Sequence, residues 1–340
     1  MRGLMKLSFL ASALTALLLG VVVLPAHAVE IPFPALPDTQ ASGQSDAMVF
    51  RDVFRPEDND TGARVGPGGR LVMDDLAPMG LASDTDSICI LSGVQGRQRG
   101  RGNMRVATNG TTWQLFAHNY DGVLPSEPET PFAVGAICVP RSSFVTNPGG
   151  VVWDYPMAPQ EHGSFPVDDS GCGGSNRDRR IPLGQASGPA FISQVEADLG
   201  SFSDHVTVEA PSSPLDNRTL WLRNTQCQSN HYAAATSFFI GVPGQTTFPK
   251  LAGRKTETLR ATSGRGAEVS MVPTREGICG FTHLAGRWEG HLEGAWLEPQ
   301  MIGGIEYWTA RVNAGSAGEV EATVTCIAYD QRWNDSGSPD

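Results

Sequence analysis

Short runs in which apolar and polar residues alternate recur along this chain, and they predict β-strands. The clearest run, EVEATVTCIA at residues 319–328, places Val320, Ala322, Val324 and Cys326 on one side and polar residues on the other. This two-residue period is typical of a half-buried strand. Turn-forming residues separate such runs, since the chain contains 39 Gly and 24 Pro. With no capped run of helical period, the sequence predicts an all-β fold.

Part of this pattern occurs three times. A shift of 190 residues aligns the stretch that begins at Cys89 with one at Cys279, and a shift of 101 aligns it with one at Ala190. The shared order is a small residue, an apolar one, Ser or Thr, an apolar one, then Gly or Ala. Each copy is followed by a tryptophan in a strand-like run, which we expect in the core: Trp113, Trp221 and Trp308. Such similarity indicates copies of one supersecondary unit, although short patterns also arise by chance.

We therefore expect three related, disulfide-stabilised β modules of about 55 residues that pack together. Their arrangement is predicted to be a pseudo-threefold barrel or prism, or a set of adjoining sandwiches. The expected segments are a signal peptide at 1–28, an extended stretch at 29–85 that can complete the first module, repeats at 86–142, 188–244 and 277–330, a Gly-, Pro- and Asp-rich flap at 143–187, a linker with strands at 245–276 and a tail at 331–340.

The six cysteines follow the repeat. In the first and third copies the opening and closing strands each carry an inward cysteine, whereas the middle copy has Ala190 and Phe239 there. A small residue facing a large one fills a core without a covalent bond. The pattern thus favours disulfides Cys89–Cys138 and Cys279–Cys326 among the many connectivities that six cysteines allow. Cys172–Cys227 then follows by elimination.

The first 28 residues resemble a secretory signal. Arg2 and Lys6 precede an apolar stretch at 7–24, and Ala26-His27-Ala28 is a small-x-small cleavage site. We predict cleavage after Ala28 and a secreted protein, periplasmic or extracellular, in which disulfides persist. A membrane anchor is the alternative, but no charged stop-transfer flank follows. No span is predicted after signal removal, because no other apolar run reaches the ~18 residues of a membrane helix.

Charge and motifs narrow the partners. The formal net charge is -11, and removal of Arg2 and Lys6 with the signal changes it to -13. An acidic exported chain is not expected to bind nucleic acid. The sequence lacks a nucleophile elbow, a zinc-protease helix and a phosphate loop, so it predicts no cofactor and no metal. Nothing in it fixes the oligomeric state.

The first candidate site is Glu289, His291 and Glu293 in the stretch WEGHLEG. On a strand, these residues would project from one face, where two carboxylates and an imidazole can bind a metal or act as acid and base. An ordinary solvated strand face produces the same row. The three residues are therefore candidates for catalysis, and no residue is assigned as catalytic.

The second candidate is an arginine-rich hairpin that contains Arg97, Arg99, Arg101 and Arg105. The planar guanidinium fork suits carboxylate, sulfate or phosphate groups. A charged hairpin that protects a sheet edge from aggregation explains the same residues.

The third candidate is a pair of tryptophans outside the repeat pattern, Trp288 and Trp296. Exposed aromatic rings form platforms for sugar faces and cations, whereas buried ones only fill a core. If these rings are exposed, the hairpin and the rings together predict ligand binding.

From these features we expect an exported, non-catalytic binding protein that recognises a glycan or another cell-surface or extracellular polymer, with an anionic surface polymer as one possibility. Repeated weak sites would add avidity. The alternatives are an exported hydrolase that uses Glu289, His291 and Glu293, and a structural component of an envelope or extracellular assembly.

Overall fold

A computed structural model shows an all-β protein, as predicted. It describes the residues 39–41, 46–54, 64–65, 71–72, 79–96, 102–119, 132–144, 152–154, 178–182, 190–197, 199–209, 219–223, 225, 232–237, 239–241, 255–290 and 292–329. The described elements are β-strands and one 3-10 turn at Arg141–Ser143. The predicted signal peptide and the predicted tail lie outside these residues.

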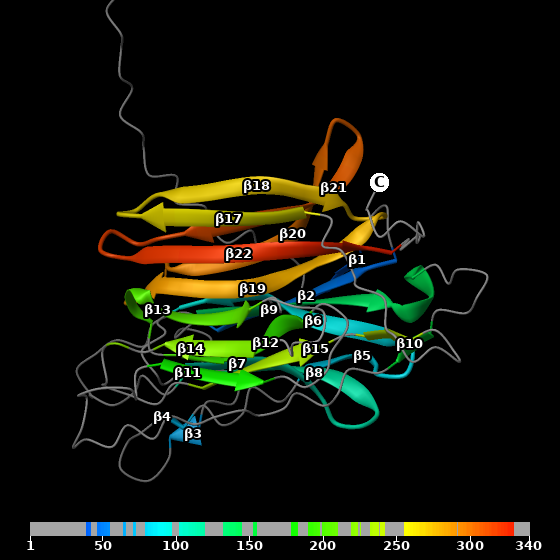
Figure 1. Cartoon of the computed structure of the whole chain (residues 1–340), viewed down its shortest axis with the longest axis horizontal. Coiled ribbons are helices and arrows are strands. Elements are labelled where there is room, and N and C mark those ends of the chain that lie inside the picture. Colours follow the sequence, from blue (N-terminus) through cyan, green and yellow to red (C-terminus); the bar gives the residue numbers. More distant parts are fainter. Residues whose placement is uncertain are drawn as a thin grey trace, which may run out of the picture.

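Three large sheets make up most of the fold (Figure 1). The seven-stranded sheet has, in order, β1 (Thr39–Ala41), β2 (Met48–Phe54), β9 (Phe132–Pro140), β6 (Ser87–Gln95), β20 (Gly294–Ile302), β21 (Ile305–Asn313) and β18 (Gly266–Pro273). The six-stranded sheet has β11 (Asp178–Pro182), β14 (Thr219–Arg223), β13 (Gly200–Glu209), β19 (Gly277–Arg287), β22 (Glu319–Ala328) and β17 (Lys255–Thr262). The five-stranded sheet has β15 (Tyr232–Ser237), β12 (Ala190–Glu196), β7 (Gly102–Thr108), β8 (Thr112–Asn119) and β5 (Met79–Ser83).

Two short pairs complete the described strands: β10 (Val152–Asp154) with β16 (Phe239–Gly241), and β3 (Arg64–Val65) with β4 (Leu71–Val72). The stretches that the sequence suggested as extension, flap and linker therefore also supply strands.

Each large sheet combines strands from two of the three similar stretches of sequence. In the seven-stranded sheet, β6 and β9 from residues 86–142 continue into β20 and β21 from residues 277–330. In the six-stranded sheet, β19 and β22 continue into β13 and β14, and in the five-stranded sheet β12 and β15 continue into β7 and β8. We call the strand pairs that join two stretches, β6 with β20, β12 with β7 and β19 with β13, the seams. Corresponding apolar residues, related by the shifts of 101 and 190, are paired at all three seams: Val94 with Ala295, Val195 with Met104 and Leu284 with Val206.

The opening strand of each stretch has a register shift at the same place. In β6 the shift lies between Leu91 and Gly93, in β12 between Ile192 and Gln194, and in β19 between Phe281 and His283. The residue inside the shift is hydroxylic in every case: Ser92, Ser193 and Thr282. A β-bulge of this kind re-aims the side chains that follow it.

Two predicted disulfides are present, Cys89–Cys138 and Cys279–Cys326. Each joins directly opposed residues of an antiparallel pair and is buried. In the middle stretch Ala190 lies opposite Ser237, so the expectation that Phe239 faces Ala190 is wrong. Cys172 and Cys227 lie outside the described residues. Disulfides indicate an oxidising compartment.

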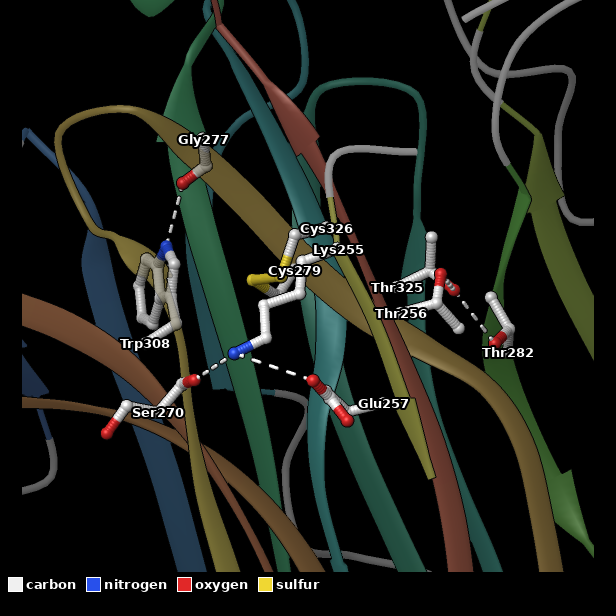
Figure 2. Close-up of a disulfide and its surroundings, with 10 residues drawn as sticks. All are labelled: Lys255, Thr256, Glu257, Ser270, Gly277, Cys279, Thr282, Trp308, Thr325 and Cys326. Atoms are coloured by element: carbon white, nitrogen blue, oxygen red, sulfur yellow. Dashed lines mark hydrogen bonds and ion pairs between the residues drawn. A yellow bond between two sulfur atoms is a disulfide. The ribbon is translucent and has the colours of Figure 1, made fainter. Parts of the chain in front are cut away.

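Two buried indoles tie the sheets together. Trp113 Nε1 donates to the Ser87 carbonyl oxygen at 3.0 Å, and Trp308 Nε1 donates to the Gly277 carbonyl oxygen at 2.7 Å. Figure 2 shows the Trp308 contact beside the Cys279–Cys326 disulfide. Because β21 and β19 belong to different sheets, this bond fixes the seven-stranded sheet on the six-stranded one. Trp113 and Trp308 are thus core residues, as predicted.

Among the described residues, none forms a helix with the length and apolar character needed to cross a membrane.

Candidate binding face on the six-stranded sheet

The two faces of the six-stranded sheet differ in chemistry. In β22, Val324 and Cys326 are buried on the disulfide side, whereas Thr323 and Thr325 point the opposite way. Figure 2 shows this division, with the disulfide on one side of the sheet and Thr325 on the other. Thr325 hydroxyl oxygen lies 3.2 Å from that of Thr256 and 3.3 Å from that of Thr282.

Next to these threonines, one side chain from every strand forms a continuous row across the sheet. The strand register places the six residues directly opposite one another in the order Arg180, Trp221, Thr207, His283, Thr323 and Thr258. A second row lies beside it and runs Arg223, His205, Ala285, Glu321 and Arg260. We call these two rows the polar face.

One end of the polar face carries a stacked arginine and tryptophan. The Arg180 guanidinium carbon lies 4.3 Å from the centre of the Trp221 ring, and Glu209 accepts from Arg180 Nε at 3.0 Å. Trp221 is half-buried, because its neighbours Leu220 and Leu222 occupy the core instead. The prediction of Trp221 as a core residue is therefore wrong. A cation over an indole forms a favourable flat surface.

The centre of the polar face is a hydrogen-bonded histidine. His283 Nδ1 lies 2.6 Å from the Thr207 hydroxyl, and His283 Nε2 lies 3.4 Å from a Glu321 carboxylate oxygen. Burial lowers the pKa of His283 below 6.5 more strongly than Glu321 raises it, and Arg260 lowers it further. A neutral imidazole has one proton, which we assign to Nε2 because that atom faces the carboxylate. Nδ1 then accepts from Thr207.

A wide bulge in β13 folds over part of the second row. The buried carboxylate of Asp204 accepts from the Gly200 amide at 3.1 Å and from both the amide and the hydroxyl of Thr225. These bonds fix the bulge so that the Phe202 ring lies 4.4 Å from the guanidinium carbon of Arg260. A second arginine–aromatic stack thus lies at the far end of the polar face, where Glu321 also binds Arg260.

Arg223 differs from the other arginines of the polar face. It is half-buried at the end of β14, and its Nε atom is buried without a hydrogen-bond partner. Arg180 and Arg260 each have a glutamate and an aromatic ring, whereas no ion pair to Arg223 occurs within the described part of the chain.

The structure separates the first predicted site. β19 ends at Arg287 and β20 begins at Gly294, so Glu289 and Glu293 lie in a loop and the predicted strand row is wrong. Glu289 is exposed, whereas Glu293 is buried and accepts from the Gly290 amide at 2.9 Å. His291 lies outside the described residues. Within the described ranges, no group of three or more His, Cys, Asp or Glu could hold a metal ion.

The two tryptophans predicted as exposed platforms are buried, so that prediction is wrong. Trp288 donates from Nε1 to the Ala285 carbonyl oxygen at 3.0 Å and has no exposed surface. Trp296 is 8 % exposed and donates to Gln95 Oε1 at 3.2 Å. Its ring lies on Gly93, where a Cβ atom would come within 2.0 Å of it.

Of the predicted arginine hairpin, Arg105 is described and Arg97, Arg99 and Arg101 are not. Arg105 is half-buried in β7, with its guanidinium carbon 4.3 Å from the centre of the Phe116 ring.

The polar face itself was not predicted, although its strands were partly visible in the sequence. The alternation in TLWLR assigns Leu220 and Leu222 to one side and Trp221 and Arg223 to the other. The stretches TET at 256–258 and TVT at 323–325 likewise signal a hydroxyl-bearing side. What the sequence lacks is the pairing that places these strands in one sheet.

No family model matches this chain, and no curated protein matches it.

Proposed function

We propose that this chain is an exported, non-catalytic binding protein that holds an extracellular polymer, a glycan, on the polar face. The observation that carries this proposal is the in-register row that runs from Arg180 to Thr258 across six strands. Strands spaced ~4.8 Å apart give such a row a length of about 24 Å, which suits an extended chain rather than a small molecule. Hydroxyl, imidazole and guanidinium groups complement sugar hydroxyls, and Trp221 offers apolar contact.

Binding is favoured over hydrolysis by the state of the candidate acids and bases. A hydrolase based on Glu289 and Glu293 needs both carboxylates at one opening, but Glu293 is buried and bonded to the backbone. Thr207, His283 and Glu321 form a hydrogen-bonded chain, yet they lie inside a sheet whose backbone amides serve the ladder.

We also propose that the three similar stretches are modules related by a pseudo-threefold axis. The matching seams, the shared register shifts and the two corresponding tryptophan bonds support this arrangement. The three opening strands β6, β12 and β19 contact one another, and three corresponding positions there carry Ile90, Phe191 and Gly280. Phe191 fills the space beside Gly280, where a Cβ atom would lie 2.5 Å from its ring.

In this arrangement each module has six strands, with β15 and β16 counted as one, because two further strands flank the four of each stretch: β2 and β5 in the first, β17 and β18 in the third, and β10 and β11 in the middle one. In the middle stretch, β10 pairs with β16 in the way that β2 pairs with β9 in the first stretch. Repeated modules would present related faces, as on other scaffolds in which the frame stays and the surface changes.

The test is affinity electrophoresis of the purified chain through gels that contain neutral and acidic soluble polysaccharides. We expect retardation by at least one polysaccharide and about tenfold or greater loss of affinity in Trp221→Ala. Tyr307→Ala, which changes a half-buried aromatic on the seven-stranded sheet, serves as the matched control and keeps full affinity. Absence of retardation by every polysaccharide, or equal loss in both variants, overturns the proposal.

A further inference from the structure

The polar face carries an arginine, Arg223, that has no ion-pair partner among the described residues. Arg223 stands beside Trp221 on the same side of β14, and its cross-strand neighbours are His205 and Asp178. Its buried Nε has no hydrogen-bond partner, which is costly for a charged group.

The ion pairs of the polar face involve two of its three arginines. Arg180 is compensated by Glu209 and Arg260 by Glu321, so these two pairs are neutral. His283 is neutral near pH 7, because burial lowers its pKa. Among the described side chains of this face, Arg223 is thus the arginine without an ion-pair partner, in a chain whose formal net charge is -11. A local positive charge on an acidic protein is a selective feature, since the overall field repels anions that the site does not bind directly.

The position of Arg223 fits a group carried by an extended chain. The row from Arg180 to Thr258 lies next to the row that Arg223 begins, with a spacing of two residues along β14. Side chains at i and i+2 of a strand point to the same side, so a polymer lying along the first row brings its substituents to the second. The guanidinium fork binds a carboxylate or a sulfate through two parallel hydrogen bonds.

We propose that Arg223 anchors an anionic substituent, a carboxylate or sulfate, of an acidic polysaccharide that lies across the polar face. This inference rests on the proposed function and narrows it from glycans in general to acidic ones. In this proposal Trp221 contacts the sugar backbone, and Arg223 binds the charged substituent.

Two matched pairs of probes test the inference by affinity electrophoresis and by titration calorimetry. Polygalacturonate is compared with its full methyl ester, which keeps the backbone and removes the negative charge. Dextran sulfate is compared with dextran in the same way. We expect the protein to prefer an acidic member of a pair, and which pair responds identifies the carboxylate or the sulfate.

The variants Arg223→Gln and Arg223→Lys then locate the contact. Arg223→Gln lowers the affinity for the acidic probe by about tenfold or more, whereas Arg223→Lys keeps the charge, loses the fork and falls between. Arg275→Gln is the control, because it makes the same change in net charge in the exposed turn that joins β18 to β19, outside the two rows of the polar face. It leaves the affinity unchanged.

The outcomes separate this inference from the proposed function. Equal binding of the charged and neutral members, or equal loss in Arg223→Gln and Arg275→Gln, overturns the inference and leaves a neutral glycan as ligand. Retardation by no polysaccharide overturns both. If Arg223 instead serves Asp178, Arg223→Gln lowers the free energy of unfolding without changing polymer binding, and this result also overturns the inference.

Discussion

The outer faces of the six-stranded and seven-stranded sheets have corresponding positions but opposite properties. His283 and Gly93 each follow the register shift of an opening strand, and each lies beside the seam to the next strand. At the seven-stranded seam Trp296 lies flat on Gly93 and is buried. At the six-stranded seam Thr207 bonds the ring of His283, and Trp221 is one strand further out and half-buried.

The arginines of the two faces differ in the same sense. Arg311 on the seven-stranded sheet binds Glu298 and Glu268, whereas Arg223 on the six-stranded sheet has no such partner in the part of the chain that the structure describes. On the seven-stranded sheet, Gly93 leaves room for the indole of Trp296, and two carboxylates pair with Arg311. The polar and aromatic groups of that face are therefore used within the protein. A histidine in place of that glycine and an arginine without a carboxylate partner leave polar groups on the six-stranded sheet, as the proposed binding requires.

The largest expected effect is that of filling the space beneath Trp296. Gly93→Ala places a methyl group within 2.0 Å of a ring that also packs against Gly135, so the ring must move. We expect a loss of about 3 kcal/mol in the free energy of unfolding, measured in urea. His283→Ala at the corresponding position loses about 1 kcal/mol, the cost of its hydrogen bonds.

A double-mutant cycle checks the cause. In a Trp296→Leu background the methyl group has room, so Gly93→Ala costs less than about 1 kcal/mol. Additive losses from Gly93→Ala and Trp296→Leu would show that the indole does not limit this position.

The two arginines give the next largest difference. Arg311→Met leaves the buried Glu298 without its ion-pair partner, and we expect a loss of about 2 to 3 kcal/mol. Arg223→Met removes a charge that has no ion-pair partner among the described residues, so we expect the free energy of unfolding to change by less than about 0.5 kcal/mol. The measurement is urea unfolding of both variants at the same pH, and equal losses would contradict the assignment of Arg223 to a ligand.

Strand content and two disulfides were predictable because they depend on local alternation. The run at 319–328 fixes the inward position of Cys326, and a copy of the pattern fixes that of Cys138. The predicted pairing in the middle stretch was wrong, because Ala190 lies opposite Ser237, two residues from the expected Phe239. A shift in pairing of this size leaves the alternation unchanged, so the sequence pattern does not reveal it.

The predictions for the Glu289–Glu293 row and for the exposed tryptophans failed for a different reason. Alternation is a property of strands, and the stretch from Glu289 to Glu293 alternates by chance in a loop. Nothing local in the sequence shows that Trp296 is buried, because its ring packs against Gly93, about 200 residues away in sequence. The polar face likewise depends on seams between distant strands. Side-chain chemistry was readable from the sequence, but the sheet that gathers it was not.

The smallest expected effect concerns the histidine that replaces Gly93 at the six-stranded seam. Burial holds the pKa of His283 below the 6.5 of an unfolded histidine, with Arg260 acting in the same direction and Glu321 against it. Between the two pKa values the unfolded chain binds more protons than the folded one, so the free energy of unfolding rises with pH. This contribution is complete above pH 6.5 and is lost as the pH falls below it.

His283→Gln isolates that contribution, because glutamine bonds Thr207 and Glu321 without titrating. We expect the free energy of unfolding of the unchanged protein, measured in urea from pH 7.5 down to pH 5, to fall more steeply than that of the variant. Other groups titrate in both proteins, so the difference between the two curves belongs to His283. Parallel curves would mean that the imidazole is not desolvated between Thr207 and Glu321. If the two curves converge as the pH falls, His283 is a neutral, hydrogen-bonded ring at the position where Gly93 admits Trp296 on the seven-stranded sheet.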